Sequence, residues 1–215
     1  MASAIGVVSQ KGGVGKSTLA RLLTTAFTQA GWETLLADLD VNQATSYQWN
    51  SRRMTNQIEP HVNVQQFPTV AQAVKMKRKY DMLIFDGHPA ATRDTLEVAR
   101  NSDMLILPTS EGLEDLEPQV KLAHELKKHV APSQIVFVLN LCGTSKPQIE
   151  EARDYLASTP YRLADGFIEQ KPTWKTALLE GRALNETVIQ TLNDKANLVL
   201  TSINNIFQKQ LTTHA

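Results

Sequence analysis

Cysteine is nearly absent from this sequence, and its scarcity excludes several classes of site. The single cysteine, Cys142, rules out a disulfide framework and any site within one chain that needs several cysteines, such as an iron–sulfur cluster. A lone thiol is typical of proteins that work in a reducing compartment. We therefore expect a cytoplasmic location.

Net charge is also absent, because 22 Lys and Arg residues balance 22 Asp and Glu residues. Attraction to nucleic acid must then come from a local basic patch and not from the chain as a whole. No apolar run approaches the roughly 20 residues that span a bilayer, and the first residues lack the charged and apolar regions of a secretion signal. Neither secretion nor membrane spanning is expected.

No internal repeat, low-complexity tract or linker-like segment divides the sequence. With 215 residues, of which 42% are hydrophobic, the chain can bury a sizeable core but has little room for a second one. We therefore expect one α/β domain over residues 1–215.

The most informative stretch that is present runs from Lys11 to Thr18 and reads KGGVGKST. It follows an apolar run at 4–8 and precedes a helix-like run at 19–30, which is the setting of a phosphate-binding loop. Glycines let backbone N–H groups close around phosphate oxygens, and the next helix adds the positive end of its dipole. The pattern predicts a nucleoside triphosphate, with Lys16 beside its β- and γ-phosphates and the Ser17 hydroxyl on a Mg²⁺ ion. The loop residues predicted to bind it are Gly12, Gly13, Val14, Gly15, Lys16, Ser17 and Thr18.

Short apolar runs alternate with longer amphipathic stretches along the rest of the chain. Most of these runs are too apolar for half-exposed strands, and their separation by helices is typical of parallel strands covered on both faces. We therefore predict a doubly wound, mostly parallel sheet, whose ligands bind at the carboxyl ends of the strands. The predicted strands are 4–9, 34–38, 62–66, 82–86, 104–108, 135–140 and a weaker one at 161–163.

Two aspartates stand where predicted strands end. Asp86 closes the strand at 82–86, which is where a Walker-B aspartate holds Mg²⁺, usually through water. The alternative is an aspartate that caps the turn after this strand. Asp38 ends the strand at 34–38 and either caps the loop that follows or binds Mg²⁺ through water. The predicted metal-binding residues are thus Ser17, Asp86 and Asp38, while His88 is expected to be a neighbour without a chemical role.

The phosphate-binding loop departs from the ordinary pattern G-x-x-x-x-G-K-[ST]. Gln10 stands where the first glycine belongs, and a second lysine, Lys11, follows it. In this the loop resembles the deviant Walker-A loop of the ParA/MinD family, a branch of the P-loop NTPases. The resemblance implies that Lys11 reaches across a dimer interface to the nucleotide of the partner chain.

Later segments resemble the same family over almost the entire chain. The stretch 38–43 is similar to the D-x-D-P-Q switch, which implies that Asp40 positions the water that attacks the γ-phosphate. Val41, Asn42 and Gln43 replace the usual Pro-Gln, so a loop one residue longer is expected. The stretch 86–89 resembles the D-x-x-P segment that responds to the γ-phosphate. Asn140 resembles the residue that helps to hold the adenine, although its position at a strand end equally fits a turn former.

The stretch 174–184 resembles the late Y-x-x-A-x-x-x-G-x-x-[VL] segment of ParA proteins, which contributes to non-specific DNA binding by the ATP-bound dimer. The DNA-binding residues that this implies are Lys171, Lys175 and Arg182. The resemblance as a whole implies a Mg²⁺-dependent ATPase with a slow intrinsic rate, which forms an ATP-dependent homodimer and segregates a plasmid, a chromosome region or other cargo. A ParB-like centromere-binding adaptor stimulates such proteins, which associate with the nucleoid in the ATP state.

Other branches of the family are weighed by what this sequence lacks. An iron protein of the nitrogenase type takes two cysteines from each subunit and is excluded. An N-terminal DNA-reading domain, as in larger plasmid ParA proteins, is not expected, because the phosphate-binding loop begins at the tenth residue. Two alternatives stay open: a MinD-like positioning ATPase associated with membranes, and a metabolic P-loop ligase of the dethiobiotin-synthetase type. Stable membrane association is not expected, since the tail at 203–211 has Lys209 alone as a basic residue.

We expect simpler structural roles for two further groups of basic residues. Lys75, Lys77, Arg78 and Lys79 precede a predicted strand, where cations complement the C-terminus of a helix. Arg52 and Arg53 follow the switch and are expected to face a partner or solvent.

Overall fold

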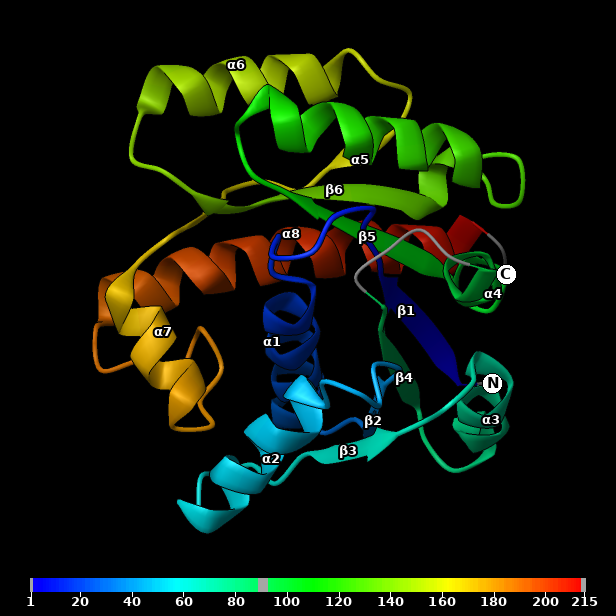
Figure 1. The fold of residues 1–215 in the computed structure, drawn as a ribbon, viewed down its shortest axis with the longest axis vertical. Coiled ribbons are helices and arrows are strands. Elements are labelled where there is room, and N and C mark those ends of the chain that lie inside the picture. Colours follow the sequence, from blue (N-terminus) through cyan, green and yellow to red (C-terminus); the bar gives the residue numbers. More distant parts are fainter. Residues whose placement is uncertain (1, 89–92, 214–215) are drawn as a thin grey trace.

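The computed structural model describes residues 2–88 and 93–213, which form a sheet with helices on both faces (Figure 1). The strands are β1 (Ser3–Val7), β2 (Thr34–Asp38), β3 (Asn63–Gln66), β4 (Met82–Asp86), β5 (Met104–Thr109), β6 (Ile135–Cys142), β7 (Arg162–Leu163) and β8 (Ile168–Glu169). The helices are α1 (Lys16–Gln29), α2 (Thr45–Thr55), α3 (Val70–Val74), α4 (Arg93–Arg100), α5 (Leu113–Leu126), α6 (Lys146–Ala157), α7 (Pro172–Leu179) and α8 (Gln190–Thr213). Two short 3₁₀ helices are η1 (Lys75–Arg78) and η2 (Pro132–Gln134).

The sheet has the strand order β3-β2-β4-β1-β5-β6-β7, and β8 also pairs with β6. Every strand pairing among the described residues is parallel. The first strand lies at the centre, between β4 and β5, so the loop that follows β1 emerges in the middle of the carboxyl edge. The predicted doubly wound parallel sheet is thus confirmed.

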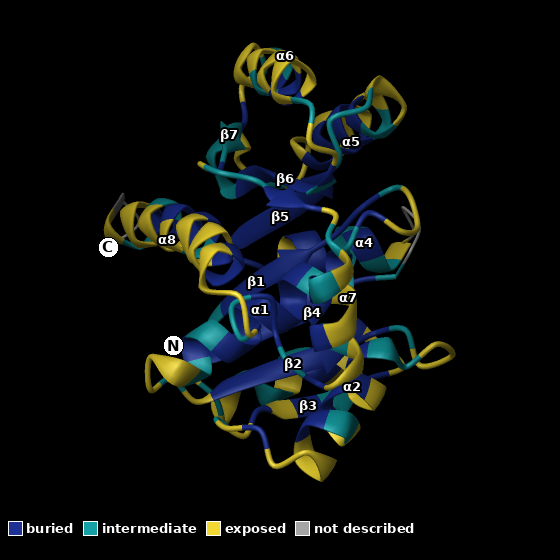
Figure 2. Cartoon of the chain, turned by 90° about the vertical axis from the view of Figure 1, so that its left-hand side faces the viewer, coloured by how far each residue is buried: buried dark blue, intermediate teal, exposed yellow. Residues whose placement is uncertain are grey.

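Both faces of the sheet are buried, which explains why its strands are apolar throughout. In β1 and the residue after it, Ala4 and Val8 belong to one hydrophobic cluster, whereas Ile5 and Val7 belong to the other. The first cluster includes side chains of α3, α4, α5 and α6, and the second includes those of α1, α2, α7 and α8. Figure 2 shows the strands in the buried colour beneath helices whose outer faces are exposed.

Predicted and observed strands agree closely. β2 and β4 have the predicted bounds, and the weak run at 161–163 contains β7. β1 ends at Val7 and not at Ser9, because Ser9 already belongs to the phosphate-binding loop, where its hydroxyl donates a hydrogen bond to the carbonyl of Lys11. The two-residue strand β8 was not predicted, since so short an element leaves no periodic pattern in the sequence.

The long C-terminal helix α8 is part of the hydrophobic core. Its apolar stripe, which includes Ala196, Val199, Ile203 and Phe207, is buried against the sheet face that α1 also covers. The ring of Phe207 meets that of Phe27 on α1 edge to face, with centroids 6.3 Å apart. Among the described residues, no helix is long and apolar enough to cross a membrane.

Candidate nucleotide-binding site

The loop between β1 and α1 has the backbone shape that encloses an anion. Gly13 and Gly15 have φ angles of 82° and 84°, a region that favours glycine. A Cβ atom at Gly15 would also overlap the side-chain amide of Asn140. Gly15 is the N-cap of α1, whose first turn contains no acidic residue. The positive end of this helix is therefore open to a phosphate group.

Lys16 lies inside this loop, where it is buried. Its Nζ atom donates hydrogen bonds to the Ser9 hydroxyl, at 2.8 Å, and to the Lys11 carbonyl, at 3.3 Å. Burial lowers the pKa of Lys16, while the nearby carboxylates of Asp86 and Asp40 act in the opposite direction. The ammonium is thus held at the point where the loop would hold the β- and γ-phosphates.

Asp86 accepts hydrogen bonds at both carboxylate oxygens. Ser17 donates to Oδ1 at 3.1 Å, and Ser46 of α2 donates to Oδ2 at 2.7 Å. The Ser46 hydroxyl in turn accepts a hydrogen bond of 3.0 Å from Nε of Arg21. Burial raises the pKa of Asp86, whereas Ser46 and the Arg21 charge lower it. The predicted Walker-B aspartate therefore lies against the predicted metal-binding hydroxyl.

This arrangement fits Mg²⁺. The ion takes oxygen ligands and keeps several waters, so one hydroxyl and one carboxylate beside a phosphate site are sufficient to hold it. The described residues contain no cluster of three or more His, Cys, Asp or Glu side chains that would form a complete metal cage. An octahedral shell here would accordingly be completed by phosphate oxygens and water.

Asp38 is buried and acts as a remote cap for α2. Its Oδ2 atom accepts backbone hydrogen bonds from Ser46 and Tyr47, both of 3.0 Å, and its Oδ1 atom accepts one of 3.2 Å from Asp40. The α2 helix needs such a cap, because its N-cap residue, Ala44, has no side-chain acceptor. Of the two roles expected for Asp38, this geometry is that of the cap.

Asp40 lies in the loop between β2 and α2 and faces the phosphate region. Its carboxylate accepts a backbone hydrogen bond of 3.1 Å from Gln43 and lies 4.0 Å from Nδ1 of His88. Asp40, Gln43, Lys16 and Asp86 line one pocket of about 280 Å³ beside the phosphate-binding loop. The predicted switch is thus next to the loop and the metal-binding pair. Its predicted counterpart after β4 extends to Pro89, which lies outside the described residues.

A larger pocket of about 790 Å³ continues from the loop toward α5 and α6, and its volume is sufficient for a nucleoside. Asn140, at the carboxyl end of β6, lines it and donates a hydrogen bond of 2.8 Å to the Val14 carbonyl. Its Oδ1 atom is buried and has no hydrogen-bond partner among the described residues. A buried acceptor of this kind is costly unless a ligand donates to it, and the exocyclic amine of adenine is such a donor.

Lys11 lies at the mouth of this pocket with its side chain 46% exposed. Its Nζ atom donates to Oδ1 of Asp115 at 2.7 Å and to the Glu114 carbonyl at 2.9 Å, both in the first turn of α5. The hydrogen bond with Asp115 raises the pKa of Lys11. Unlike Lys16, this lysine is accessible from outside the chain.

Gln119 of α5 is a loop-positioning residue that the sequence did not reveal. It is buried, and its Oε1 atom accepts a hydrogen bond of 3.0 Å from the Gln10 backbone. Its amide donates to the carbonyls of Pro108, at 2.8 Å, and Val8, at 3.4 Å. Gln119 thus joins the ends of β1 and β5 where the loop begins. The sequence signal was weak, being one polar residue on the apolar side of an amphipathic helix.

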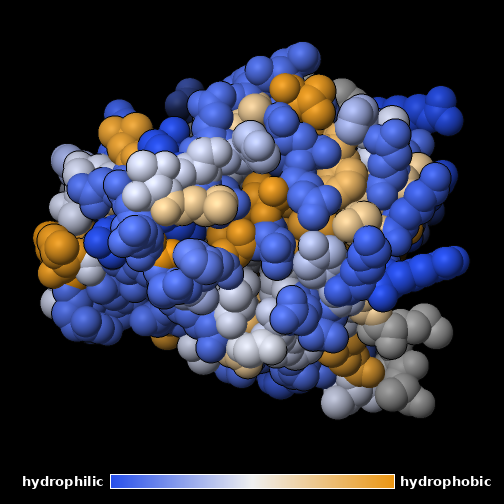
Figure 3. All heavy atoms as spheres, turned by 90° about the horizontal axis from the view of Figure 1, so that it is seen from below, coloured by the Kyte–Doolittle hydropathy of each residue, from blue (hydrophilic) through white to orange (hydrophobic). Residues whose placement is uncertain are grey.

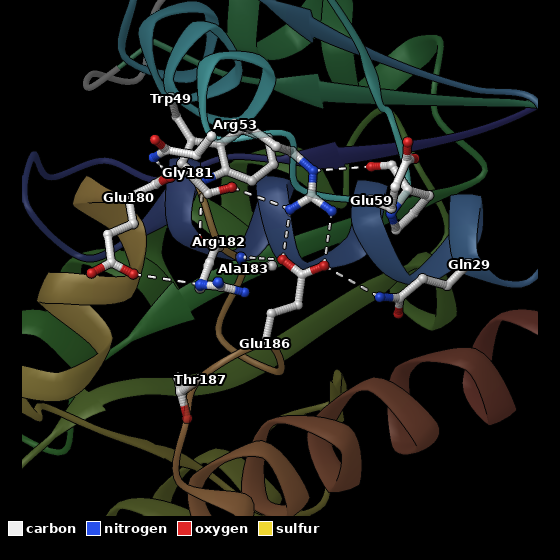
Figure 4. A network of polar contacts seen from close by, with 12 residues as sticks. Gln29, Trp49, Arg53, Glu59, Glu180, Gly181, Arg182, Ala183, Glu186 and Thr187 are labelled. Atoms are coloured by element: carbon white, nitrogen blue, oxygen red, sulfur yellow. Dashed lines mark hydrogen bonds and ion pairs between the residues drawn. The ribbon is translucent and has the colours of Figure 1, made fainter.

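A second buried network ties α2 to the segment after α7 (Figure 4). The guanidinium of Arg53 forms hydrogen bonds of 2.6 and 2.8 Å with the carboxylate of Glu186 and another with the Gly181 carbonyl. Trp49 donates from its indole nitrogen to the Arg182 carbonyl at 3.0 Å. The expectation that Arg53 faces a partner or solvent is therefore wrong, because Glu186 and surrounding carbonyls neutralise and enclose its charge.

The three residues predicted to bind DNA lie on or near α7, and two of them have acidic partners. Lys171 pairs with Glu169 at 2.8 Å, and Arg182 pairs with Glu180 at 3.4 Å. Glu169 also pairs with Lys195. Lys175 is exposed on the helix.

Cys142 takes no part in this site as a reactive group. It is buried at the end of β6, and burial together with the charge of Glu111 raises its pKa to about 12. A thiol with so high a pKa stays protonated at neutral pH and is a poor nucleophile.

Comparisons with known proteins agree with this geometry. Residues 5–184 match the family described as the CobQ/CobB/MinD/ParA nucleotide binding domain. No curated protein sequence matches the chain.

Several solved structures are similar over nearly the whole chain. The cell division ATPase MinD of Pyrococcus furiosus has a TM-score of 0.75 at 21% identity, covering 96% of this chain and 100% of that one. The septum site-determining protein MinD from Pyrococcus horikoshii OT3, complexed with Mg-ADP, has a TM-score of 0.72 at 21% identity, covering 93% and 94%. A protein assigned to plasmid partition in Borrelia burgdorferi B31, bound to AMPPNP, has a TM-score of 0.73 at 16% identity, covering 98% and 100%. At these identities the likeness concerns the fold.

Proposed function

This chain belongs to the CobQ/CobB/MinD/ParA nucleotide-binding family, and from that premise we propose that it is a ParA-like partition ATPase that binds and hydrolyses ATP with Mg²⁺. The ParA/MinD members of the family are ATPases. Two of the similar structures are complexes with Mg-ADP and AMPPNP, which supports the same ligands here.

The observation that carries the proposal is the pair of lysines in one loop. Lys16 is buried and its ammonium faces inward, as any P-loop enzyme requires. The side chain of Lys11 is half-exposed at the pocket mouth and points to Asp115, so only the Lys11 carbonyl faces the inside of the loop. A second lysine at the pocket mouth can contact the nucleotide of a partner chain when that chain packs against this side of the molecule. The proposed active form is therefore a dimer with ATP enclosed at its interface.

Each residue of the site has a role in the proposed hydrolysis. The loop from Gly12 to Thr18 orients the phosphates, and Lys16 offsets their negative charge. Ser17 and Asp86 would hold Mg²⁺, which neutralises charge on the β- and γ-phosphates when it is bound. Asp40 orients the attacking water, which is sufficient for slow hydrolysis because phosphoryl transfer depends mainly on positioning.

We further propose that the ATP-bound dimer binds DNA without sequence preference and that a ParB-like adaptor stimulates its hydrolysis. Such a cycle moves a plasmid, a chromosome region or other cargo over the nucleoid, in the cytoplasm. The likeness in fold to a plasmid partition protein from Borrelia supports this choice, as does the burial of the apolar stripe of α8 against the sheet, although Leu198 on the same helix is exposed. The ligase alternative gives no reason for an exposed Lys11.

A direct test follows the oligomeric state and the hydrolysis together. Light scattering with Mg²⁺ and a non-hydrolysable ATP analogue should give a dimer, and ADP should give a monomer. Phosphate release should be slow and should require Mg²⁺. A chain that stays monomeric with the analogue, or that consumes ATP only with an added carboxylate substrate, would contradict the proposal and favour the ligase.

A further inference from the structure

The described residues carry a second basic surface, at the opposite edge of the sheet from the phosphate-binding loop. Three basic segments lie shortly before a parallel strand: η1 before β4, the end of α4 before β5, and the turn after α5 before η2 and β6. Because parallel strands begin at one edge of a sheet, the three segments lie along the same edge. In Figure 1 this is the side of α3, α4 and the N-terminus.

Polar contacts join these segments into one continuous surface. Lys77 of η1 donates a hydrogen bond of 2.9 Å to the carbonyl of Asn101, just after α4. Arg100, the last residue of α4, lies 3.4 Å from Nδ1 of His129 in the turn after α5. The exposed cations that surround these contacts are Lys75, Arg78, Lys79, Lys127 and Lys128, which we call the amino-edge belt.

The belt differs from the α7 segment in whether its cations are already held in ion pairs. Within the described part of the chain, none of its five cations forms an ion pair or a side-chain hydrogen bond. At α7, by contrast, Glu169 and Glu180 already neutralise Lys171 and Arg182. Binding a polyanion at α7 would first break those pairs, whereas the belt offers its charges without such a cost.

Compensation of a helix dipole at the end of the short 3₁₀ helix η1 does not explain so many cations. Lys77 and Arg100 lie at or near the ends of η1 and α4, where a positive charge complements a helix dipole. The five belt residues extend beyond these contacts into solvent. Figure 3 shows strongly hydrophilic side chains projecting from the side of the molecule that α3 and α4 occupy in Figure 1.

The chemistry of the belt favours nucleic-acid phosphates over a lipid surface. Binding to a membrane surface usually combines basic residues with exposed apolar side chains that enter the bilayer. The exposed large hydrophobic residues of the described chain lie elsewhere: Val41, Tyr47, Met54, Leu113, Leu179, Val188, Ile189 and Leu198. Contacts with a phosphate backbone need cations alone, and each one releases condensed counterions.

We propose that the amino-edge belt is the surface on which this chain binds the phosphate backbone of duplex DNA. The proposal rests on the proposed DNA binding and locates it away from α7. Since Lys11 and the belt lie at opposite edges of the sheet, each chain carries a complete belt. A dimer formed through the Lys11 edge then carries its two belts at its outer ends, and its binding is strengthened on DNA long enough for separate segments to contact both belts.

Two triple variants of matched composition test this placement. The belt variant is Arg78→Gln, Lys127→Gln and Lys128→Gln, and the α7 variant is Lys171→Gln, Lys175→Gln and Arg182→Gln. Each removes one Arg and two Lys, so the change in net charge is the same. Thermal unfolding of both variants checks that they are folded, and fluorescence anisotropy with Mg²⁺, a non-hydrolysable ATP analogue and labelled duplex DNA gives the affinity over a range of salt concentrations.

The belt variant should bind DNA more weakly and with a smaller dependence on salt. The slope of the logarithm of affinity against the logarithm of salt concentration should fall by about 0.9 for each phosphate contact removed, up to about 2.7 for three. The α7 variant should keep nearly the affinity and slope of the unmodified chain.

Other outcomes would overturn the belt as the DNA surface. Loss of binding in the α7 variant alone, or equal loss in both variants, would leave DNA binding intact as a function but place it elsewhere. If the unmodified chain binds no DNA, the proposed function fails as well. Belt-dependent pelleting with phosphatidylglycerol vesicles, without DNA binding, would assign the belt to a membrane surface.

Discussion

Lys11 donates a hydrogen bond of 2.7 Å to Asp115, across the mouth of the nucleotide pocket. The pair joins the first residue of the phosphate-binding motif to the first turn of α5, and both side chains are partly open to solvent. Lys11 must leave Asp115 before it can reach a nucleotide in another chain. The ion pair is therefore an intramolecular competitor of the proposed dimer contact.

Lys11→Ala should separate nucleotide binding from dimerisation. The variant keeps Gly12 to Thr18 and should bind ATP, yet it should stay monomeric in light scattering and lose the ATP-dependent increase in DNA binding. Lys146→Ala, at an exposed lysine on α6, serves as a control that should dimerise normally. A Lys11→Ala chain that dimerises like the control would refute the sandwich mechanism.

Asp115→Asn should have the opposite effect on assembly. Removing the carboxylate leaves Lys11 without its anionic partner, so dimerisation should begin at a lower concentration of ATP analogue. The measurement is a titration of the analogue followed by light scattering at fixed protein concentration. An unchanged midpoint would mean that the ion pair does not compete with assembly.

Lys16→Ala should abolish ATP binding. It removes the buried side-chain cation that this loop directs at the phosphates, and the Ser9 hydroxyl loses its donor. Calorimetric titration with a non-hydrolysable ATP analogue gives the affinity directly. Affinity equal to that of the unmodified chain would remove the assignment of the loop.

Asp40→Ala should retain ATP and dimerise but hydrolyse little. The substitution removes the group that orients water and leaves the phosphate contacts of the loop in place. A phosphate-release assay at saturating ATP measures the turnover, and light scattering on the same sample reports the dimer. Turnover at the normal rate would contradict the role given to Asp40.

Glu186→Gln should lower the free energy of unfolding by about 3 kcal/mol, because removing one charge of a buried ion pair leaves the other uncompensated. Arg53 is then held in the core with a neutral partner. The control is Glu180→Gln, whose partner Arg182 is half-exposed and whose loss should cost less than about 1 kcal/mol. Urea unfolding of the two variants compares them, and equal midpoints would show that the Arg53 pair contributes no special stability.

The elements whose sequence pattern is local could be predicted from the sequence. The run at 82–86 and the glycine loop carry their structure in their own residues, so β4, the loop and the position of Asp86 were predicted. Side-chain contacts between segments that are distant in the sequence could not be predicted. No residue near Arg53 in the sequence indicates that Glu186 is its partner, and none near Gln10 indicates Gln119. Each of these contacts depends on how segments that are distant in the sequence pack together.

The fold also explains why the environment predicted for Arg53 from the sequence alone was wrong and why two roles stayed open for Asp38. Arg53 looks like a surface residue in a polar helix, yet the close approach of Gly181 brings that helix against the late segment and buries it. A Cβ atom at Gly181 would overlap the backbone of Arg53. Asp38 had two possible roles by position alone, and only the arrangement of β2 and α2 reveals that three backbone N–H groups converge on it.

The central position of β1 has a consequence for the order of events on the ribosome. β1 and the phosphate-binding loop are synthesised before the strands beside them, because Ile5 pairs with Ile84 and Met104, which come much later in the sequence. The loop therefore emerges long before the strands that flank it, of which β4 brings Asp86, and Gln119 and Asn140 arrive later still. A nascent chain cannot assemble the pocket until most of its length has left the exit tunnel, so premature capture of nucleotide by an unfinished chain is prevented by topology.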